Sequence, residues 1–67
     1  MKDVNSLPHG EELEVLKLIA QGNISKEVAA IRGTSVNTVY NQRKHMLKTT
    51  GAKSMEELVA RYVNSLK

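Results

Sequence analysis

A row of amides and amines on one predicted helix carries the clearest chemistry in this sequence. At about 100° per residue, Asn37, Asn41, Lys44 and Lys48 fall in line along one side of a helix over residues 36–49. We call these four residues the amide–lysine stripe. Asparagine offers donor and acceptor atoms that match a base edge, typically adenine, and lysine reaches guanine acceptors or phosphate. The stripe therefore predicts a surface for duplex nucleic acid, with an ordinary solvated helix face as the alternative.

Other side chains near this stripe are suited to the nucleic-acid backbone. The hydroxyl groups of Ser35 and Thr38, near the helix start, can bond phosphate oxygens. Tyr40 borders the stripe and can contact a thymine methyl group or a phosphate. Arg43 falls at the margin of the core, and two roles stay open for it. Its guanidinium either pairs with a carboxylate such as that of Glu12 or contacts phosphate.

A helix-turn-helix is the element that must hold the stripe outward. Ala29, Gly33 and Val39 stand at offsets 0, 4 and 10. Alanine lets a second helix cross close to the first, and glycine takes a positive φ at the end of that first helix. Valine then anchors the second helix on the core while its other face points outward, where a major groove can receive it.

The distribution of charge agrees with a polyanion as partner. The net charge is +3, and no acidic residue occurs between residues 28 and 55. Six of the seven acidic residues flank that stretch, and Glu27 directly precedes it. A basic middle between acidic ends is the charge pattern expected of a nucleic-acid binder, although a merely solvated basic surface would look similar. The basic residues of the stretch are Arg32, Arg43, Lys44, Lys48 and Lys53.

Apolar periodicity and capping signals predict an all-α fold of four short helices. The first three span residues 11–20, 26–32 and 36–49, and a capping box of Ser54 and Glu57 opens the fourth. The predicted N-caps of the second and third helices are Ser25 and Ser35, and the predicted stops are Gly22, Gly33 and Gly51. The predicted core-facing stripes are Leu13, Leu16 and Ala20, flanked by Val15 and Ile19; Val28, Ala29 and Ile31; Val39, Met46 and Thr50; and Met55, Leu58, Val59, Tyr62 and Leu66.

Length and composition exclude several other classes of protein. The 67 residues suit one small domain over residues 9–67, preceded by a disordered lead-in or linker stub over residues 1–8. The chain has no cysteine, no second metal ligand at useful spacing from His9 and no feature that calls for a cofactor. It has neither a membrane-spanning apolar run nor a signal peptide, so we expect a cytoplasmic location. No paired carboxylates, nucleophile–base pair or phosphate-binding glycine loop points to an enzyme.

With these features placed, residues 12–58 resemble the LuxR-type (GerE-type) DNA-binding domain found at the C-terminus of NarL/FixJ response regulators. The resemblance implies a bacterial transcription regulator with four helices, of which the third enters the major groove and the fourth makes a dimer contact on DNA. The family usually adds an N-terminal receiver or ligand-sensing domain, so the chain is expected to be either an excised fragment or a single-domain member. The carrying motifs are E-x-E-V-L at 12–16, A-Q-G at 20–22, S-K-E-V-A at 25–29, S-x-N-T-V at 35–39, K-H-M-L-K at 44–48 and G-A-K-S at 51–54.

The resemblance also implies roles for individual residues. The base-reading positions fall on Tyr40, Asn41 and Lys44. The backbone-contact positions fall on Ser25, Lys26, Thr38 and Lys48. The dimer contact of the fourth helix is assigned to Met55, Leu58, Val59, Tyr62 and Val63. The expected partners are double-stranded DNA, a second copy of the chain and RNA polymerase.

The chain departs from the family pattern in its core. Arg32, Thr34 and Thr50 stand where the family is usually apolar, and we expect Ile24 and Ile31 to compensate through a shifted local register. A buried hydroxyl without a partner costs on the order of 1–3 kcal/mol, which predicts a less stable domain. These departures favour a second hypothesis, a protein-interaction module that captures a related regulator or a polymerase subunit. Its contact face would be Met55, Tyr62, Val63 and Leu66.

Overall fold

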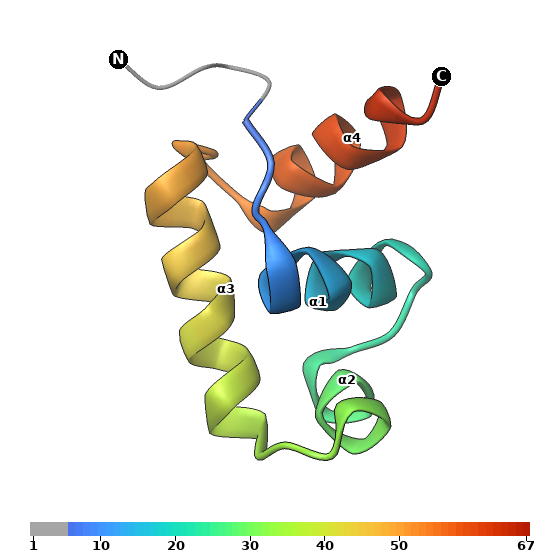
Figure 1. Ribbon diagram of the computed structural model, residues 1–67, viewed down its shortest axis with the longest axis vertical. Coiled ribbons are helices and arrows are strands. Elements are labelled where there is room, and N and C mark those ends of the chain that lie inside the picture. Colours follow the sequence, from blue (N-terminus) through green and yellow to red (C-terminus); the bar gives the residue numbers. More distant parts are fainter. Residues whose placement is uncertain (1–5) are drawn as a thin grey trace.

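Four helices make up the regular structure of this chain in a computed structural model, which describes residues 6–67 (Figure 1). No strand occurs among those residues, so the predicted all-α, four-helix fold is confirmed. No helix within them is both long enough and apolar enough to cross a membrane. The helices are α1 (Gly10–Ala20), α2 (Ser25–Arg32), α3 (Val36–Thr50) and α4 (Met55–Ser65).

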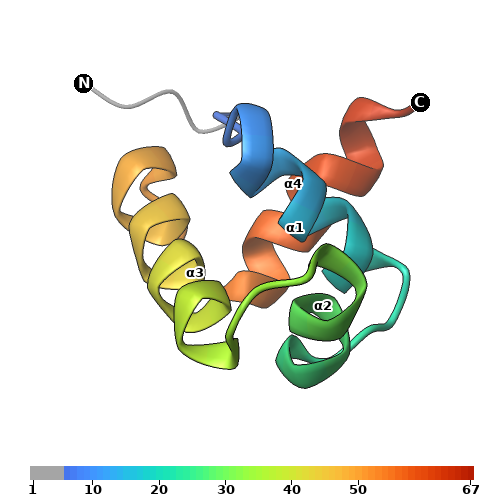
Figure 2. The same ribbon diagram turned by 60° about the horizontal axis from the view of Figure 1, so that its bottom comes forward.

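Helix α1 lies at the centre of the arrangement. It packs against each of the other three helices, while α2 and α4 lie at opposite ends of the molecule and do not contact each other (Figure 1). Helix α3, the longest, runs along one side and also packs on both α2 and α4 (Figure 2). One long flank of α3 is therefore left without a neighbouring helix.

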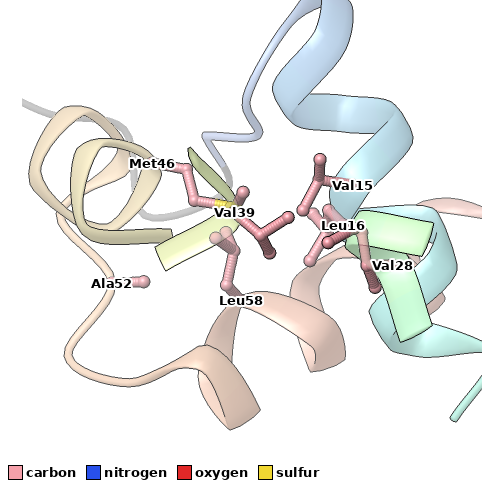
Figure 3. Close-up of a cluster of buried hydrophobic side chains, with 8 residues drawn as sticks. Val15, Leu16, Val28, Val39, Met46, Ala52 and Leu58 are labelled. Atoms are coloured by element: carbon pink, nitrogen blue, oxygen red, sulfur yellow. The ribbon is translucent and has the colours of Figure 1, made fainter. Parts of the chain in front are cut away.

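The core collects side chains from all four helices (Figure 3). Six side chains have no exposed surface, and burying each such aliphatic side chain contributes about 1.5–3 kcal/mol. Both apolar anchors of the predicted helix-turn-helix are in this core, with Val39 fully buried and Ala29 5% exposed. The buried apolar residues are Val15, Leu16, Val28, Ala29, Val39, Met46, Ala52 and Leu58.

Glycines end α2 and α3 as predicted. Gly33 has φ +70° and ψ +34°, a left-handed conformation that a side chain would strain. The backbone N–H of Thr34 donates to the Ala29 carbonyl (2.9 Å), which closes the turn between α2 and α3. Gly51 has φ +75° at the end of α3, and its N–H donates to the Leu47 carbonyl (3.0 Å).

Two of the three predicted serine caps are present. Ser35 Oγ accepts from the N–H of Thr38 (3.1 Å) at the start of α3. Ser54 Oγ accepts from the N–H of Glu57 (3.1 Å) at the start of α4. Each bond satisfies one backbone donor that the helix start would otherwise leave without a partner.

The predicted cap of α2 is wrong. Ser25 is the first residue of the helix itself, and Ile24 occupies the N-cap position without a side-chain cap. The carboxylate of Glu27 instead accepts from the backbone N–H of Ile24 (2.9 Å). The Ser25 hydroxyl is engaged by Arg43 from the facing helix, so a tertiary contact has taken the atom that a local cap would need.

Two of the three departures from the family pattern, Thr34 and Thr50, are accommodated differently from the expectation, and Arg32 is half-buried. Ile24 and Ile31 are 63% and 59% exposed, so neither compensates within the core. Thr34 is exposed and carries no burial cost. Thr50 is 2% exposed, yet its Oγ1 donates to the Met46 carbonyl (2.6 Å) and accepts from the Ala52 N–H (3.4 Å). Because that hydroxyl is satisfied, the expected penalty of 1–3 kcal/mol does not arise there.

The predicted lead-in over residues 1–8 falls partly outside the described residues, which begin at Ser6. Leu7 packs against the core and Pro8 is buried. The carbonyl of Ser6 accepts from Arg61 Nη1 (3.3 Å), and the same nitrogen donates to the Thr50 carbonyl (2.9 Å). Arg61 Nη2 also lies 2.7 Å from Glu57 Oε2. Residues 6–8 thus lie on the four-helix body, and the division at residue 9 stays a prediction.

Candidate nucleic-acid interface

The amide–lysine stripe lies on the face of α3 opposite the core. All four of its residues are exposed, whereas the buried residues of α3 are Val39, Met46 and Thr50, as predicted. The stripe lies about 180° around α3 from the buried Val39 and Met46, so it is turned away from the core. Its amide and amine groups are therefore presented to one side as a continuous polar row.

The start of α3 differs electrostatically from the starts of the other helices. Helices α1, α2 and α4 each carry at least one glutamate in their first turn, and α3 carries no acidic residue there. The N-terminus of a helix bears a partial positive charge that a carboxylate would compensate. At α3 no side chain provides that compensation, so the helix start remains attractive to a phosphate.

The two predicted hydroxyl contacts at this start are linked to each other. Ser35 Oγ lies 2.9 Å from Thr38 Oγ1 as well as accepting from the Thr38 N–H. A hydroxyl has one donor and two acceptor lone pairs, so this pair retains hydrogen-bonding capacity beyond the cap. Ser35 is exposed and Thr38 half-buried, which places both at the edge of the surface that carries the stripe.

Arg43 connects the two helices of the helix-turn-helix. Its Nη1 donates to Ser25 Oγ (2.6 Å), and its guanidinium carbon lies 5.9 Å from the centroid of the Tyr40 ring. The predicted pairing of Arg43 with Glu12 is wrong, since Glu12 Oε2 instead lies 2.6 Å from His45 Nδ1. Arg43 and His45 are two residues apart, about 200° around α3, so one carboxylate on α1 cannot meet both.

Two open hollows lie on either side of Tyr40 and Arg43. The hollow on the α4 side, of about 450 Å³, includes all three residues that the family resemblance assigns to base reading. The hollow on the α2 side, of about 360 Å³, includes the exposed Lys26. The first is lined by Asn37, Tyr40, Asn41, Arg43, Lys44, Leu47 and Met55, and the second by Ile19, Asn23, Ile24, Ser25, Lys26, Tyr40 and Arg43.

The two hollows meet at Tyr40 and Arg43, so Lys26 lies on a surface that adjoins the one with Asn41 and Lys44. Ser25 is the exception among the residues of this surface. Ser25 is only 6% exposed, and its hydroxyl is occupied by Arg43, so its side chain does not face outward. Only the backbone of Ser25 remains for a contact, through the N–H groups of the first turn of α2. Lys26, Tyr40 and Asn41 are all exposed.

Only part of the predicted dimer face on α4 is open to a second molecule. Leu58 has no exposed surface and belongs to the chain's own core, so its assignment to a dimer interface is wrong. Val63 is 44% exposed and available to a second molecule. The other three assigned residues, Met55, Val59 and Tyr62, are half-buried and pack against the core with part of their surface open. Leu66, predicted to face the core, is 67% exposed.

Sequence reasoning missed three contacts between helices, those of Ser25 with Arg43, Glu12 with His45 and Thr50 with Arg61. No local pattern signals any of these contacts, because each joins residues from different helices. The one available hint was the placement of Arg43 at the margin of the core. No group of three potential metal-ligating side chains occurs within the described part of the chain.

Comparison with known proteins points in the same direction. Residues 11–62 match the family described as "Bacterial regulatory proteins, luxR family" (GerE). The chain is 46% identical over 48 residues to the oxygen regulatory protein NreC of Staphylococcus aureus strains JH9, JH1 and Mu3. The alignment covers 72% of this chain and 22% of each relative, so the chain spans about a fifth of their length. No solved structure gives a significant match.

Proposed function

We propose, from the premise that this chain belongs to the luxR family of bacterial regulatory proteins, that α3 enters the major groove of double-stranded DNA and reads a specific sequence. The family domain is a non-enzymatic DNA-binding domain of transcription regulators. The observation that carries the finer proposal is the exposure of the complete amide–lysine stripe on the side of α3 turned away from the core. A single α-helix fits the major groove, where each base pair presents a distinct set of donors and acceptors.

Base reading is proposed for Tyr40, Asn41 and Lys44, which are neighbours on the exposed surface of α3. An asparagine amide can make two hydrogen bonds to adenine, and a lysine amine can reach the guanine acceptors. Each well-placed contact of this kind contributes about 1–3 kcal/mol of discrimination against the wrong base. Asn37, one turn earlier on the stripe, extends the same row toward the helix start.

Backbone contacts are proposed on both sides of that row. The acid-free start of α3, with Ser35 and Thr38, meets one phosphate, and the first turn of α2 with Lys26 meets another. Lys48 extends the contact to the far end of the stripe. Such contacts fix the orientation of the helix in the groove and make affinity depend on salt.

We also propose that the chain binds DNA as a homodimer through α4. The apolar surface that this helix leaves open supports the proposal, and it comprises the exposed Val63 and parts of Met55, Val59 and Tyr62. Two copies related by a two-fold axis would address half-sites separated by a whole number of helical turns. Contact with RNA polymerase and a cytoplasmic location stay predictions.

Selection of bound sequences from a random duplex pool, followed by titration of the selected site, tests the proposal. We expect Lys44→Ala to weaken the selected site by about 1–3 kcal/mol and to relax one base position. We expect Lys48→Ala to weaken all sequences alike and to reduce the salt slope by about 1. Lys67→Ala, which removes the same charge from an exposed position after α4, is the matched control and should change neither property.

Two results would contradict the proposal. If Lys44→Ala and Lys48→Ala bind the selected site as tightly as the parent chain, α3 does not face the DNA. If the parent chain binds duplex DNA weakly and without salt dependence, the interaction-module hypothesis replaces DNA binding. A repeat with fixed spacing in the selected sequences is the expected sign of a dimer.

A further inference from the structure

Arg43 is a cation whose contacts are all neutral. Among the described residues no carboxylate pairs with it, and its partners are the Ser25 hydroxyl and the Tyr40 ring. Ser25 is 6% exposed, so the bonded end of the guanidinium points inward rather than toward solvent. Arg43 itself is half-buried. This is an unusual placement for a residue whose only task is to meet a phosphate at the surface.

We propose that Arg43 is a positioning residue that sets base specificity through Tyr40 and does not itself contact DNA. The inference rests on the proposed function, because it concerns how the same surface reads its sequence. The guanidinium joins the first residue of α2 to the middle of α3 and lies against the ring that borders the amide–lysine stripe.

The hydrogen bond to Ser25 fixes the relation between the two helices. It is the one side-chain hydrogen bond between α2 and α3 within residues 6–67. Ser25 lies beside Lys26 in the turn of α2 assigned to phosphate contact, and Arg43 lies one residue before Lys44. A bond between those two points therefore holds the phosphate-contacting turn and the base-reading row in a fixed register.

The contact with Tyr40 limits the freedom of an exposed ring. Tyr40 is 48% exposed, and a ring at such a position would ordinarily sample several rotamers in the free protein. The guanidinium over the ring provides a cation–π contact at 5.9 Å from the ring centroid. Ordering this ring before binding reduces the entropy lost on binding and confines it to one approach to the base pair.

A lysine would not reproduce this arrangement. Its amine is a compact, strongly hydrated point charge, whereas the guanidinium is a planar fork that bonds Ser25 with one nitrogen while its central carbon lies 5.9 Å from the centroid of the Tyr40 ring. Arg43→Lys therefore preserves the charge and removes the geometry. Arg43→Met preserves most of the apolar stem and removes both the charge and the donors.

The test compares these two variants with Ser25→Ala and with the double variant Ser25→Ala/Arg43→Met. For each chain, thermal unfolding tests whether it folds, and selection from a random duplex pool gives the base preference. Titration at several salt concentrations gives the slope of log affinity against log salt concentration. Arg32→Met is the matched control, because it removes an arginine from the end of α2 outside the assigned contacts.

We expect all four variants to lose discrimination at one base pair, from a ratio of about 5- to 150-fold in the parent toward unity. The dependence of affinity on salt should stay at the parent value. The double variant should lose no more discrimination than Arg43→Met alone, because that change already removes the hydrogen bond to Ser25. Arg32→Met should keep the parent's base preference. A residue that only stabilised the fold would lower the folded fraction and leave the discrimination ratio unchanged.

Three results would overturn the inference. A slope reduced by about 0.9 in Arg43→Met but retained in Arg43→Lys would make Arg43 a phosphate contact. Unchanged base preference in Arg43→Lys and Ser25→Ala would remove the link to Tyr40, even if Arg43→Met failed to fold. Absence of salt-dependent duplex binding by the parent chain would refute the proposed function, and this inference with it, before any variant is compared.

Discussion

Replacing Asn37 by aspartate should stabilise the free domain and weaken its complex with DNA. Asn37 is the second residue of α3, the helix whose first turn has no acidic residue, and its side chain is exposed on the amide–lysine stripe. A carboxylate at this position would compensate the positive end of the helix. The same carboxylate would stand where the proposed complex places a phosphate and a base edge.

The two effects can be estimated separately. Interaction of the new charge with the helix dipole contributes about 0.3–1 kcal/mol of stability at low ionic strength. In a domain of this size that raises the melting temperature by about 1–8 °C. On DNA the variant loses an amide contact of about 1–3 kcal/mol and adds charge repulsion of about 1 kcal/mol. Affinity for the selected duplex should therefore fall by roughly 30- to 700-fold.

Thermal unfolding at low salt and fluorescence anisotropy with a labelled duplex measure the two quantities on the same preparation. Asn64→Asp is the matched control, since it makes the same substitution at an exposed position in the last turn of α4. There the carboxylate meets the negative end of a helix, so stability should fall slightly and duplex affinity should change little. An Asn37→Asp variant that is more stable and binds as well as the parent would refute the placement of α3 against DNA.

Four further substitutions test the packing, each measured by denaturant unfolding. Leu58→Ala should lower the free energy of unfolding by about 2–5 kcal/mol, because Leu58 is fully buried, whereas Val63→Ala should change it by no more than about 0.5 kcal/mol; equal effects would contradict the reassignment of Leu58. Gly33→Ala should cost about 1–2 kcal/mol from backbone strain alone, since a Cβ there meets nothing within 4 Å, and a neutral result would argue against the left-handed turn. Thr50→Val should cost about 1–3 kcal/mol, because it leaves the Ala52 N–H without its acceptor, and a more stable variant would contradict that bond.

Local signals predicted α3 almost completely. A serine cap, a periodic apolar face and a terminal glycine are each properties of neighbouring residues, and Ser35, Met46 and Gly51 all behave as predicted. The exposed stripe follows from the same periodicity, because fixing which side is buried also fixes which side is not. The helix most important to the proposed function was for this reason also the easiest to predict.

The errors concern contacts between helices. Ser25 was suited equally to a local cap and to a partner elsewhere, and only the packed structure shows that Arg43 takes its hydroxyl. Ile31 lies about 200° around α2 from Ala29, so with α2 packed through Ala29 the isoleucine is turned outward. The apolar stripe on α4 likewise did not show that Leu58 is fully buried in the core and is not part of a dimer face.

The hydrogen bonds and the ion pair of Arg61 affect how deletions of α4 can be interpreted. One guanidinium holds the chain before α1, the last turn of α3 and the first part of α4 through Ser6, Thr50 and Glu57. Deleting α4 would therefore also remove the hydrogen bond that holds the C-terminal end of α3, and it would expose the part of the core that Leu58 fills. A truncated chain that no longer binds DNA would say nothing about pairing between two copies, and only point changes at Val63 separate the two activities.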